Sequence, residues 1–357
     1  MVGASLFSSA GIAETYFEEV GINIVAANEL IQERAELYQA LYPNSKMIAG
    51  SILDENVFKS LVKNTPEKLD FLIASPPCQG MSVAGKNRNI EQMINDERNY
   101  LVFKIIDFIK LKSPDFVLIE NVPGMVSLFK GKIKDEILKS LEELGYTVNF
   151  QILKASEYGV PQHRRRVFFI GTKNGEKFEF PLPTHKEQED LIFKKMVSTY
   201  DALHDLPLLE NELGEPIQEY ALPIQNSYQE LMRHNSNSVL NHIAANHSDK
   251  VKETIKLVPP GKNYKALPEE LRNSRNFNVA WTRFPDHAPS PTIDTGHRHH
   301  FHYYANRVPT VRECARLQSF PDRFEFIGNK TEQFRQVGNA VPPVLAQTLA
   351  KKILEKL

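Results

Sequence analysis

The sequence has 357 residues, 41% of them hydrophobic, and a formal net charge of −1. A chain of this length is expected to form one large domain or two unequal ones. Its two cysteines, Cys78 and Cys314, exclude a disulfide framework and the thiolate-rich zinc site of base deaminases. No apolar run is long enough to span a membrane and the first residues do not form an export signal, so we expect a cytoplasmic protein without a membrane partner.

From residue 2 to about residue 171, short apolar runs alternate with stretches of helical period. This alternation is typical of an α/β fold, in which helices cover both faces of a mainly parallel sheet. Ligands of such folds bind at the carboxyl ends of the strands. The predicted strands are Ala4–Phe7, Ile22–Ala27, Phe71–Ala74, Phe116–Ile119, Val148–Leu153 and Val167–Ile170.

The first predicted strand leads into small residues, Ser8 to Gly11, that let the backbone approach a ligand. The turn lacks the three glycines of the dinucleotide fingerprint, which disfavours a dehydrogenase. Glu29 ends the second strand about twenty residues later, where an acid can accept hydrogen bonds from two ribose hydroxyls. A solvated carboxylate that opens a helix is an equally good interpretation of Glu29 alone.

Two later strands end in groups that can carry chemistry. Cys78 follows a buried strand and two prolines, and exposed backbone N–H groups after it would favour the reactive thiolate. A buried structural cysteine is the alternative. Glu120 ends the next strand, where an acid must be paired or partly protonated, so its pKa is expected to be raised. The two strands bring Cys78 and Glu120 to one edge of the sheet, which predicts a catalytic pair.

A run of three arginines begins the last predicted strand of this region. Alternate side chains share a face, so Gln162, Arg164 and Arg166 are expected to point together and Arg165 away. Because these cations enter a buried strand, Arg164 or Arg166 needs an anion or a carbonyl oxygen as a partner.

After residue 171 the alternation stops, and residues 175 to about 300 are richer in Pro, Asn and His without a clear period. This composition predicts a second, smaller domain of irregular build. We place the catalytic and cofactor-binding domain at 1–183, the irregular domain at 184–325 and a returning C-terminal segment at 326–357.

Basic side chains are concentrated in the second half of the chain. Residues 1–80 hold ten acidic and five basic side chains, whereas residues 271–323 hold four acidic side chains, eight arginines and five histidines. The second segment is therefore predicted to form a phosphate-binding face. The histidine-rich stretch 296–302 could suggest a metal site, but no acidic or thiol ligands adjoin it. We favour a basic loop and predict no metal.

Five blocks of the sequence resemble a known family in their order and spacing. The chain is similar to the DNA (cytosine-5) methyltransferases of the bacterial restriction-modification type, apart from about residues 184–290, the family's variable target-recognition region. The resemblance implies an S-adenosylmethionine-dependent, Rossmann-like methyltransferase that acts as a monomer on double-stranded DNA, with a cognate restriction endonuclease acting separately. The blocks are Pro76–Ser82, Glu120–Val122, Gln162–Arg166, Arg312–Pro321 and Gly338–Ala340.

The resemblance also implies roles for single residues. Cys78 would add to C6 of a flipped-out cytosine, and Glu120 would hold the ring N3 proton and the exocyclic amine. Arg166 and Arg164 would contact the base carbonyl and the surroundings of the thiol. The predicted DNA contacts are Gln79, Ser82, Arg283 and Arg298, the first two on a loop that closes over the site.

For the cofactor, the resemblance implies that Phe7 stacks on the adenine and that Glu29 binds the ribose. Some expected residues are replaced: Ser5 and Ser51 stand where the family has Asp, and Ser9 and Ile12 stand where it has Gly. Asp54 is not taken as a substitute for the missing acid at position 51. The predicted cofactor contacts are Phe7, Ser9, Gly11, Glu29, Ile52, Pro77, Leu101 and Asn339.

Two other functions remain open from the sequence. The altered first turn would suit a descendant that binds DNA without turnover, although Cys78, Glu120 and Arg166 would then have had no reason to persist together. A tRNA-directed member of the family is the second alternative. The recognition region, of about a hundred residues, favours the reading of a DNA major groove over that alternative.

Overall fold

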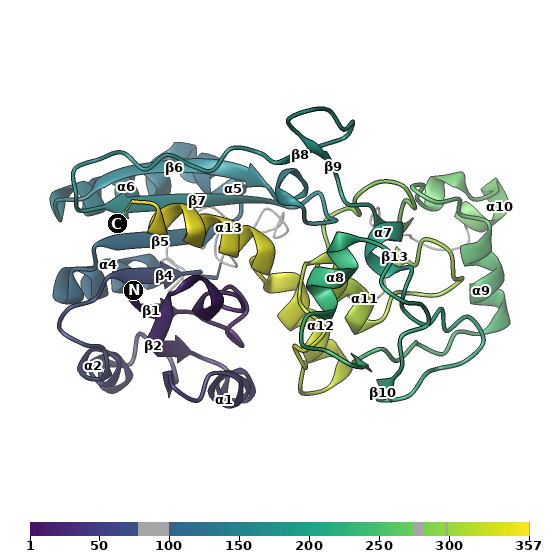
Figure 1. The fold of residues 1–357 in the computed structure, drawn as a ribbon, viewed down its shortest axis with the longest axis horizontal. Helices are drawn as coiled ribbons and strands as arrows, with labels where there is room; N and C mark the ends of the chain where they lie inside the picture. Colours follow the sequence, from purple (N-terminus) through teal and green to yellow (C-terminus); the bar gives the residue numbers. More distant parts are fainter. Residues whose placement is uncertain (78–99, 274–280, 297–298, 357) are drawn as a thin grey trace. The chain divides into compact units, whose positions relative to one another are not determined.

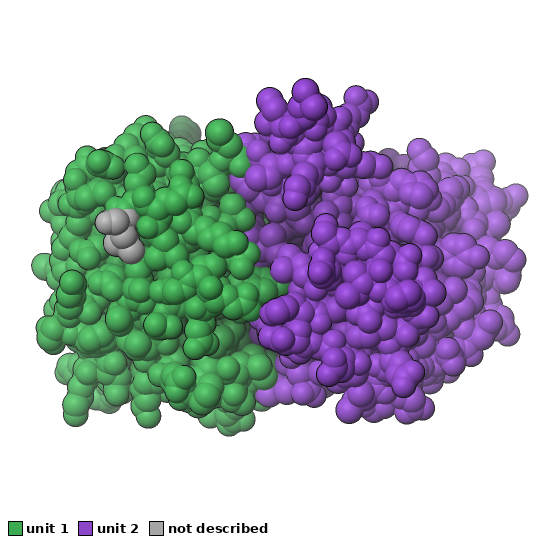
Figure 2. Space-filling view, in the orientation of Figure 1, with its two compact units in different colours: residues 1–154, 165–182, 346–357 green, residues 155–164, 183–345 purple. Residues whose placement is uncertain are grey.

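The computed structural model describes residues 1–77, 100–273, 281–296 and 299–356, which divide into two compact units. Unit 1 comprises residues 1–154, 165–182 and 346–357, and unit 2 comprises residues 155–164 and 183–345 (Figure 2). The sequence placed the boundaries at 183/184 and 325/326. In the structure the chain passes from unit 1 to unit 2 between residues 182 and 183 and returns between residues 345 and 346, inside a helix. Residues 155–164 also belong to unit 2.

Unit 1 contains, among the described residues, a seven-stranded sheet with the order β3-β2-β1-β4-β5-β7-β6 (Figure 1). Strands β1 to β5 pair in parallel, while β7 is antiparallel to both β5 and β6. The predicted α/β fold with a mainly parallel sheet is therefore confirmed. The strands are β1 (Val2–Leu6), β2 (Asn23–Glu29), β3 (Lys46–Ala49), β4 (Phe71–Ala74), β5 (Phe116–Asn121), β6 (Thr147–Lys154) and β7 (Arg165–Thr172).

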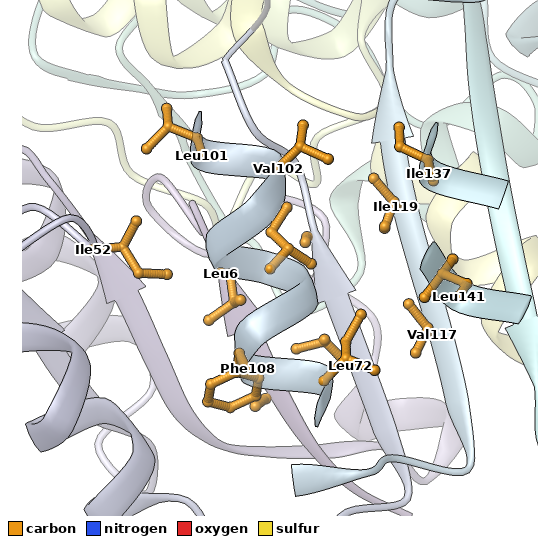
Figure 3. Close-up of a cluster of buried hydrophobic side chains, with 14 of the residues drawn as sticks. Leu6, Ile52, Leu72, Leu101, Val102, Phe108, Val117, Ile119, Ile137 and Leu141 are labelled. Atoms are coloured by element: carbon orange, nitrogen blue, oxygen red, sulfur yellow. The ribbon is translucent and has the colours of Figure 1, made fainter. Parts of the chain in front are cut away.

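Both faces of the central strands are buried, because helices cover the sheet on both sides. Alternate residues such as Leu72 and Val117 pack into one apolar cluster under the helices α2, α4 and α6, which lie on that face (Figure 3). The residues between them, such as Phe71 and Leu118, are buried on the other face, where the part of α13 from Ala346 lies (Figure 1). Two-sided burial explains why these strands are continuous apolar runs.

The helical elements of unit 1 follow local signals in the sequence. For example, the carboxylate of Asp54 accepts hydrogen bonds from the backbone N–H groups of Asn56 and Val57 and so caps α2. The elements are η1 (Glu18–Val20), α1 (Gln32–Leu41), α2 (Glu55–Asn64), α4 (Tyr100–Lys112), α5 (Gly124–Ser127), η3 (Leu128–Gly131), α6 (Lys132–Glu143) and α13 (Pro343–Leu354).

Unit 2 is built from short helices and two-residue strands, which confirms the predicted irregular second domain. Its helical elements are η4 (Ala155–Tyr158), α7 (Thr199–Leu203), α8 (Ser227–Arg233), α9 (Asp249–Lys256), η5 (Tyr264–Ala266), α10 (Glu269–Arg272), α11 (Val311–Leu317) and α12 (Lys330–Asn339). Its strands are β8 (His185–Lys186), β9 (Lys194–Lys195), β10 (Ile217–Gln218), β11 (Val239–Leu240), β12 (Thr282–Arg283) and β13 (His300–Phe301).

Buried arginines hold the irregular segments of unit 2 together. The fully buried Arg316 forms ion pairs with Asp205, at 3.0 Å, and with Asp322, at 2.6 Å. Arg312, also fully buried, donates to the carbonyl oxygens of Leu240 and Pro321. Where regular ladders are short, these side chains satisfy the buried carbonyl groups instead.

Candidate functional site

The turn between β1 and η1 has an unusual backbone beside the end of β2. Phe7, Ser9 and Gly11 have φ values of 59°, 52° and 74°. A Cβ atom on Gly11 would lie 2.1 Å from the ring of Tyr42, so only glycine fits there. The two oxygens of Glu29 accept hydrogen bonds from the backbone N–H groups of Ser9 and Ile31, both at 2.9 Å. These bonds fix the carboxylate beside the turn.

An apolar wall lies next to this turn. Ile52 and Leu101 belong to the same buried cluster as Leu6 (Figure 3). The partly buried Phe7 packs against that cluster. The carboxylate of Asp54 is engaged as the cap of α2. The predicted contacts Phe7, Ser9, Gly11, Glu29, Ile52 and Leu101 therefore all belong to one end of the unit 1 sheet.

A second group of predicted residues lies at the carboxyl end of β5. The Glu120 carboxylate, whose side chain is 8% exposed, forms an ion pair with Arg166, in which Nε lies 2.8 Å from Oε1. In the antiparallel register Glu120 is opposite Phe168, and Arg166 is two residues along β7 on the same face. The buried acid thus has the charged partner that its position required, and Arg166 has the predicted anion.

The neighbouring Asn121 connects this pair to the segment that leads to Cys78. Strands β4 and β5 are parallel neighbours, with Ala74 beside Ile119. Past the end of β4, the Asn121 side-chain amide donates a 3.0 Å hydrogen bond to the carbonyl oxygen of Pro76. Asn121 was given no role from the sequence, although a buried amide directly after the candidate acid Glu120 is a signal for such an anchor.

Four predicted residues, Cys78, Gln79, Ser82 and Arg298, lie outside the described residues. Pro77, a predicted cofactor contact, is the last described residue before Cys78 and is exposed. Asn339 is also exposed and ends α12 in unit 2.

Arg164 differs from Arg166 in its surroundings. It belongs to unit 2, is 1% exposed, and donates to the carbonyl oxygens of Ile293 at 3.0 Å and Gly338 at 2.7 Å. Gln162 is also buried there and donates to the carbonyl oxygen of Leu317. Arg164 thus has the carbonyl partners that were expected for an arginine in this run, and its hydrogen bonds to them connect separate segments of unit 2. Arg165 is exposed, as expected for the side chain that points away.

The structure contradicts the predicted phosphate contact of Arg283. This residue is 4% exposed and its guanidinium donates to buried carbonyl oxygens, including those of Val258 at 2.6 Å and Ile255 at 2.8 Å. Arg307, Arg312 and Arg316 of the same basic segment are also buried. The excess of arginine therefore reflects hydrogen bonds and ion pairs inside unit 2. A count of charges in the sequence could not distinguish such buried arginines from arginines on an exposed face.

Within the residues that the structure describes, no group of three or more His, Cys, Asp or Glu side chains is arranged to hold a metal ion. No helix within the same ranges has the length and apolar character needed to cross a membrane.

The sheet and the groups at its carboxyl edge are those of a methyltransferase that uses S-adenosylmethionine, and comparisons with known proteins agree. The family model for C-5 cytosine-specific DNA methylase matches residues 1–355. The type II methyltransferase M1.HphI of Haemophilus parahaemolyticus is 34% identical, over 98% of this chain and 86% of that protein. M1.HgaI of Avibacterium volantium is 33% identical, over 100% and 99% of the two chains.

Solved structures show the same fold. A protein of E. coli designated a DNA modification methyltransferase, encoded within a prophage, has a TM-score of 0.78 and 25% identity, with 99% of each chain covered. DNMT2 of Spodoptera frugiperda, solved as a mutant, has a TM-score of 0.57 at 16% identity, again over 99% of both chains, and shows the fold alone.

The chain belongs to the C-5 cytosine-specific DNA methylase family. The predicted enzyme class, DNA (cytosine-5) methyltransferase of the restriction-modification type, is confirmed, and so is the predicted cofactor, S-adenosylmethionine. The first turn is compatible with this molecule, because the partly buried Phe7 leaves apolar surface beside the cluster that contains Ile52 and Leu101, and the buried Ser9 hydroxyl has no partner among the described residues.

Proposed function

We propose that this enzyme methylates C5 of a flipped-out cytosine within a specific double-stranded DNA sequence, through a covalent bond between Cys78 and C6. The modification would protect DNA from a cognate restriction endonuclease that acts separately. The protein would work as a monomer in the bacterial cytoplasm, where it meets the nucleoid through its substrate.

The ion pair of Glu120 and Arg166 carries this proposal. It lies at the end of β5, and the hydrogen bond from Asn121 to Pro76 holds the described part of the segment that continues to Cys78 beside the same strand. A buried pair of this kind costs desolvation energy, so it is weak as a device for stability alone. The pair is useful in a reaction that needs both a hydrogen-bond acceptor, Glu120, and a cation held in a fixed position, Arg166.

The chemistry explains why a thiolate and a carboxylate are needed together. Cytosine C5 is a poor nucleophile until another nucleophile adds at C6, and the Cys78 thiolate can both add there and leave again. Negative charge then develops on the ring, and Glu120 would hold the proton at N3 and accept a hydrogen bond from the exocyclic amine. Arg166 would keep the Glu120 carboxylate in position and contact the base carbonyl.

When bound, S-adenosylmethionine would supply an electrophilic methyl group, so that a C5–CH3 bond forms as the S–CH3 bond breaks and S-adenosylhomocysteine is left. Loss of the C5 proton to a base then lets the electrons of the C5–H bond restore the ring double bond, and the C6–S bond breaks to release Cys78 as thiolate. The target base has to leave the helix, because these groups cannot reach both sides of a stacked ring.

A duplex with 5-fluorocytosine at the target position tests the covalent step. Fluorine cannot leave C5 as a cation, so the bond between Cys78 and C6 should persist after methyl transfer and give a protein–DNA adduct visible by mass spectrometry. Cys78→Ser should form no adduct. Cys314→Ala, which changes the buried free cysteine of unit 2, should form it as the wild type does.

An adduct mapped to another residue, or full methylation by Cys78→Ser, would remove the assignment. The target sequence follows from bisulfite sequencing of DNA from a host that expresses the enzyme. Equal methyl transfer to tRNA and to duplex DNA would favour the tRNA-directed alternative, and titration with S-adenosylmethionine without heat would favour the inactive DNA-binding alternative.

A further inference from the structure

The turn that follows β1 contains a buried carboxylate that the proposed mechanism does not use. Glu14 is 3% exposed, and neither of its oxygens has a hydrogen-bond partner among the residues that the structure describes. The hydroxyl of Ser9, in the same turn, is likewise buried without a partner in these residues. Unpartnered polar groups are rare in protein interiors, and each calls for an explanation.

Among the residues that the structure describes, no positive charge compensates the Glu14 carboxylate. Burial raises its pKa to about 7. The Ser5 hydroxyl on β1 and the backbone N–H of Glu14 itself are close enough to lower this pKa in part, although neither meets the geometry of a hydrogen bond to the carboxylate. On the α1 side Glu14 faces Tyr38, whose own pKa is raised by burial and by the carboxylate. No lysine, arginine or histidine of the described chain is among the groups that shift the Glu14 pKa.

The position of Glu14 suggests what the missing partner is. Its neighbour Ser5 stands where the family has an aspartate, in the strand that leads to Phe7 and the cofactor turn. This chain therefore lacks the acid on β1 but has an acid on the turn, and the Glu14 carboxylate interacts with the Ser5 side chain at that position. A carboxylate that is buried and unpaired in the protein alone suits a ligand that brings its own positive charge.

We propose that Glu14 is the counter-ion of the α-ammonium group in the methionine part of S-adenosylmethionine. An ammonium has three N–H donors, so it can satisfy the two oxygens that lack partners. The sulfonium of the same molecule is also positive but has no donor, and it would leave both oxygens without a hydrogen bond. Glu14 is thus a cofactor-binding residue of this chain, in addition to Glu29.

Calorimetric titration with three ligands separates these roles. S-adenosylmethionine has both the ammonium and the sulfonium, S-adenosylhomocysteine keeps only the ammonium, and 5′-methylthioadenosine has neither. Glu14→Gln should weaken binding of the first two by the same factor, about 10- to 100-fold, because a hydrogen-bonded charge pair is lost. Its affinity for 5′-methylthioadenosine should equal that of the wild type.

Glu18→Gln is the matched control, because Glu18 is an exposed acid four residues further along and its replacement removes the same charge. It should leave all three affinities unchanged. Weakening of S-adenosylmethionine alone would assign Glu14 to the sulfonium and overturn the proposal. Equal weakening of all three ligands would show a structural role, and no weakening would show no role.

Proton release gives a test on the wild-type protein, which does not depend on the folding of a variant. With a pKa of about 7, Glu14 is largely protonated at pH 6.5 and must lose this proton to pair with an ammonium. Titration in two buffers of different ionisation enthalpy should show release of roughly three quarters of a proton with S-adenosylmethionine and with S-adenosylhomocysteine. Release with 5′-methylthioadenosine, or with none of the three, would contradict the proposal.

Discussion

The first turn of unit 1 and the helix α11 of unit 2 each bury a glutamate, with opposite surroundings. In α11 the two oxygens of Glu313 accept hydrogen bonds from Arg307 at 2.7 and 2.9 Å, and the Thr310 backbone N–H donates a third. Burial alone would raise the Glu313 pKa, but Arg307 outweighs it and holds that pKa far below the usual range. Glu14 has no such partner in the described chain, and its pKa is raised to about 7.

The difference separates two uses of buried charge. The charge of Glu313 is neutralised within the protein, so it serves the fold of unit 2 and needs no ligand. The charge of Glu14 is neutralised only when something binds, so the free protein carries the cost of its desolvation. The hydrogen-bond partners of a buried charge, more than its burial, therefore indicate whether a site is structural or functional.

The largest expected effect follows from Glu313→Gln. The substitution leaves the Arg307 guanidinium buried without a counter-charge, and we expect a loss of about 3–5 kcal/mol in the free energy of unfolding. Urea denaturation measures it. The loss should persist from pH 8 down to pH 5, because a carboxylate with a lowered pKa contributes its stability above the ordinary value of 4.5 and loses it only at lower pH.

The second prediction has the opposite sign. The pKa of Glu14 is raised from 4.5 to about 7, so its ionisation destabilises the free protein as the pH rises through this range. Glu14→Gln should therefore be more stable than the wild type by up to about 3 kcal/mol at pH 8 and by less than about 1 kcal/mol at pH 5, since one pKa unit corresponds to about 1.4 kcal/mol. Denaturation of both proteins without ligand at pH 5, 6.5 and 8 checks this.

A gain in the stability of Glu14→Gln that is independent of pH would contradict this explanation, because such a gain would have a cause other than the charge of the Glu14 carboxylate. With saturating S-adenosylmethionine at pH 8 the advantage of the variant should shrink or reverse, since the ligand stabilises the protein that binds it more tightly.

The smallest effect concerns the predicted DNA contacts. Arg298→Gln should weaken DNA binding and lower the slope of log affinity against log salt by about one, as expected for one lost phosphate contact. Arg283→Gln should leave the slope unchanged, because its guanidinium is bonded inside unit 2. Titration of a labelled duplex at several salt concentrations distinguishes the two variants. Equal slopes for the wild type, Arg298→Gln and Arg283→Gln would show that Arg298 does not contact phosphate.

Much of the sheet could be predicted because its strands are buried on both faces. The runs at 71–74 and 116–119 match β4 and the core of β5. The edge strand β3 was missed among the apolar runs, since its four residues include the exposed Lys46. A strand could be predicted from the sequence when it was long enough and buried on both faces.

The candidate site was predicted in part, for a similar reason. Glu120 and Arg166 were found because an acid and a cation at the ends of apolar strands need partners, and the structure pairs them with each other. Arg283 was misassigned because composition does not distinguish a buried guanidinium from an exposed one. Glu14 was missed because its neighbours in the sequence, Ala13 and Thr15, do not mark the turn as buried.

The division of the chain limits how specificity can be exchanged between relatives. The backbone passes between the two units four times, after residues 154, 164, 182 and 345. Gln162 and Arg164 bond to the carbonyl groups of Leu317, Ile293 and Gly338 within unit 2. A transplanted recognition segment would have to present those backbone oxygens again. A chimaera that replaces only residues 183 to about 290 with the segment of a relative retains the native Ile293, Leu317 and Gly338. We expect such chimaeras to fold more often than chimaeras in which the whole of unit 2 is replaced.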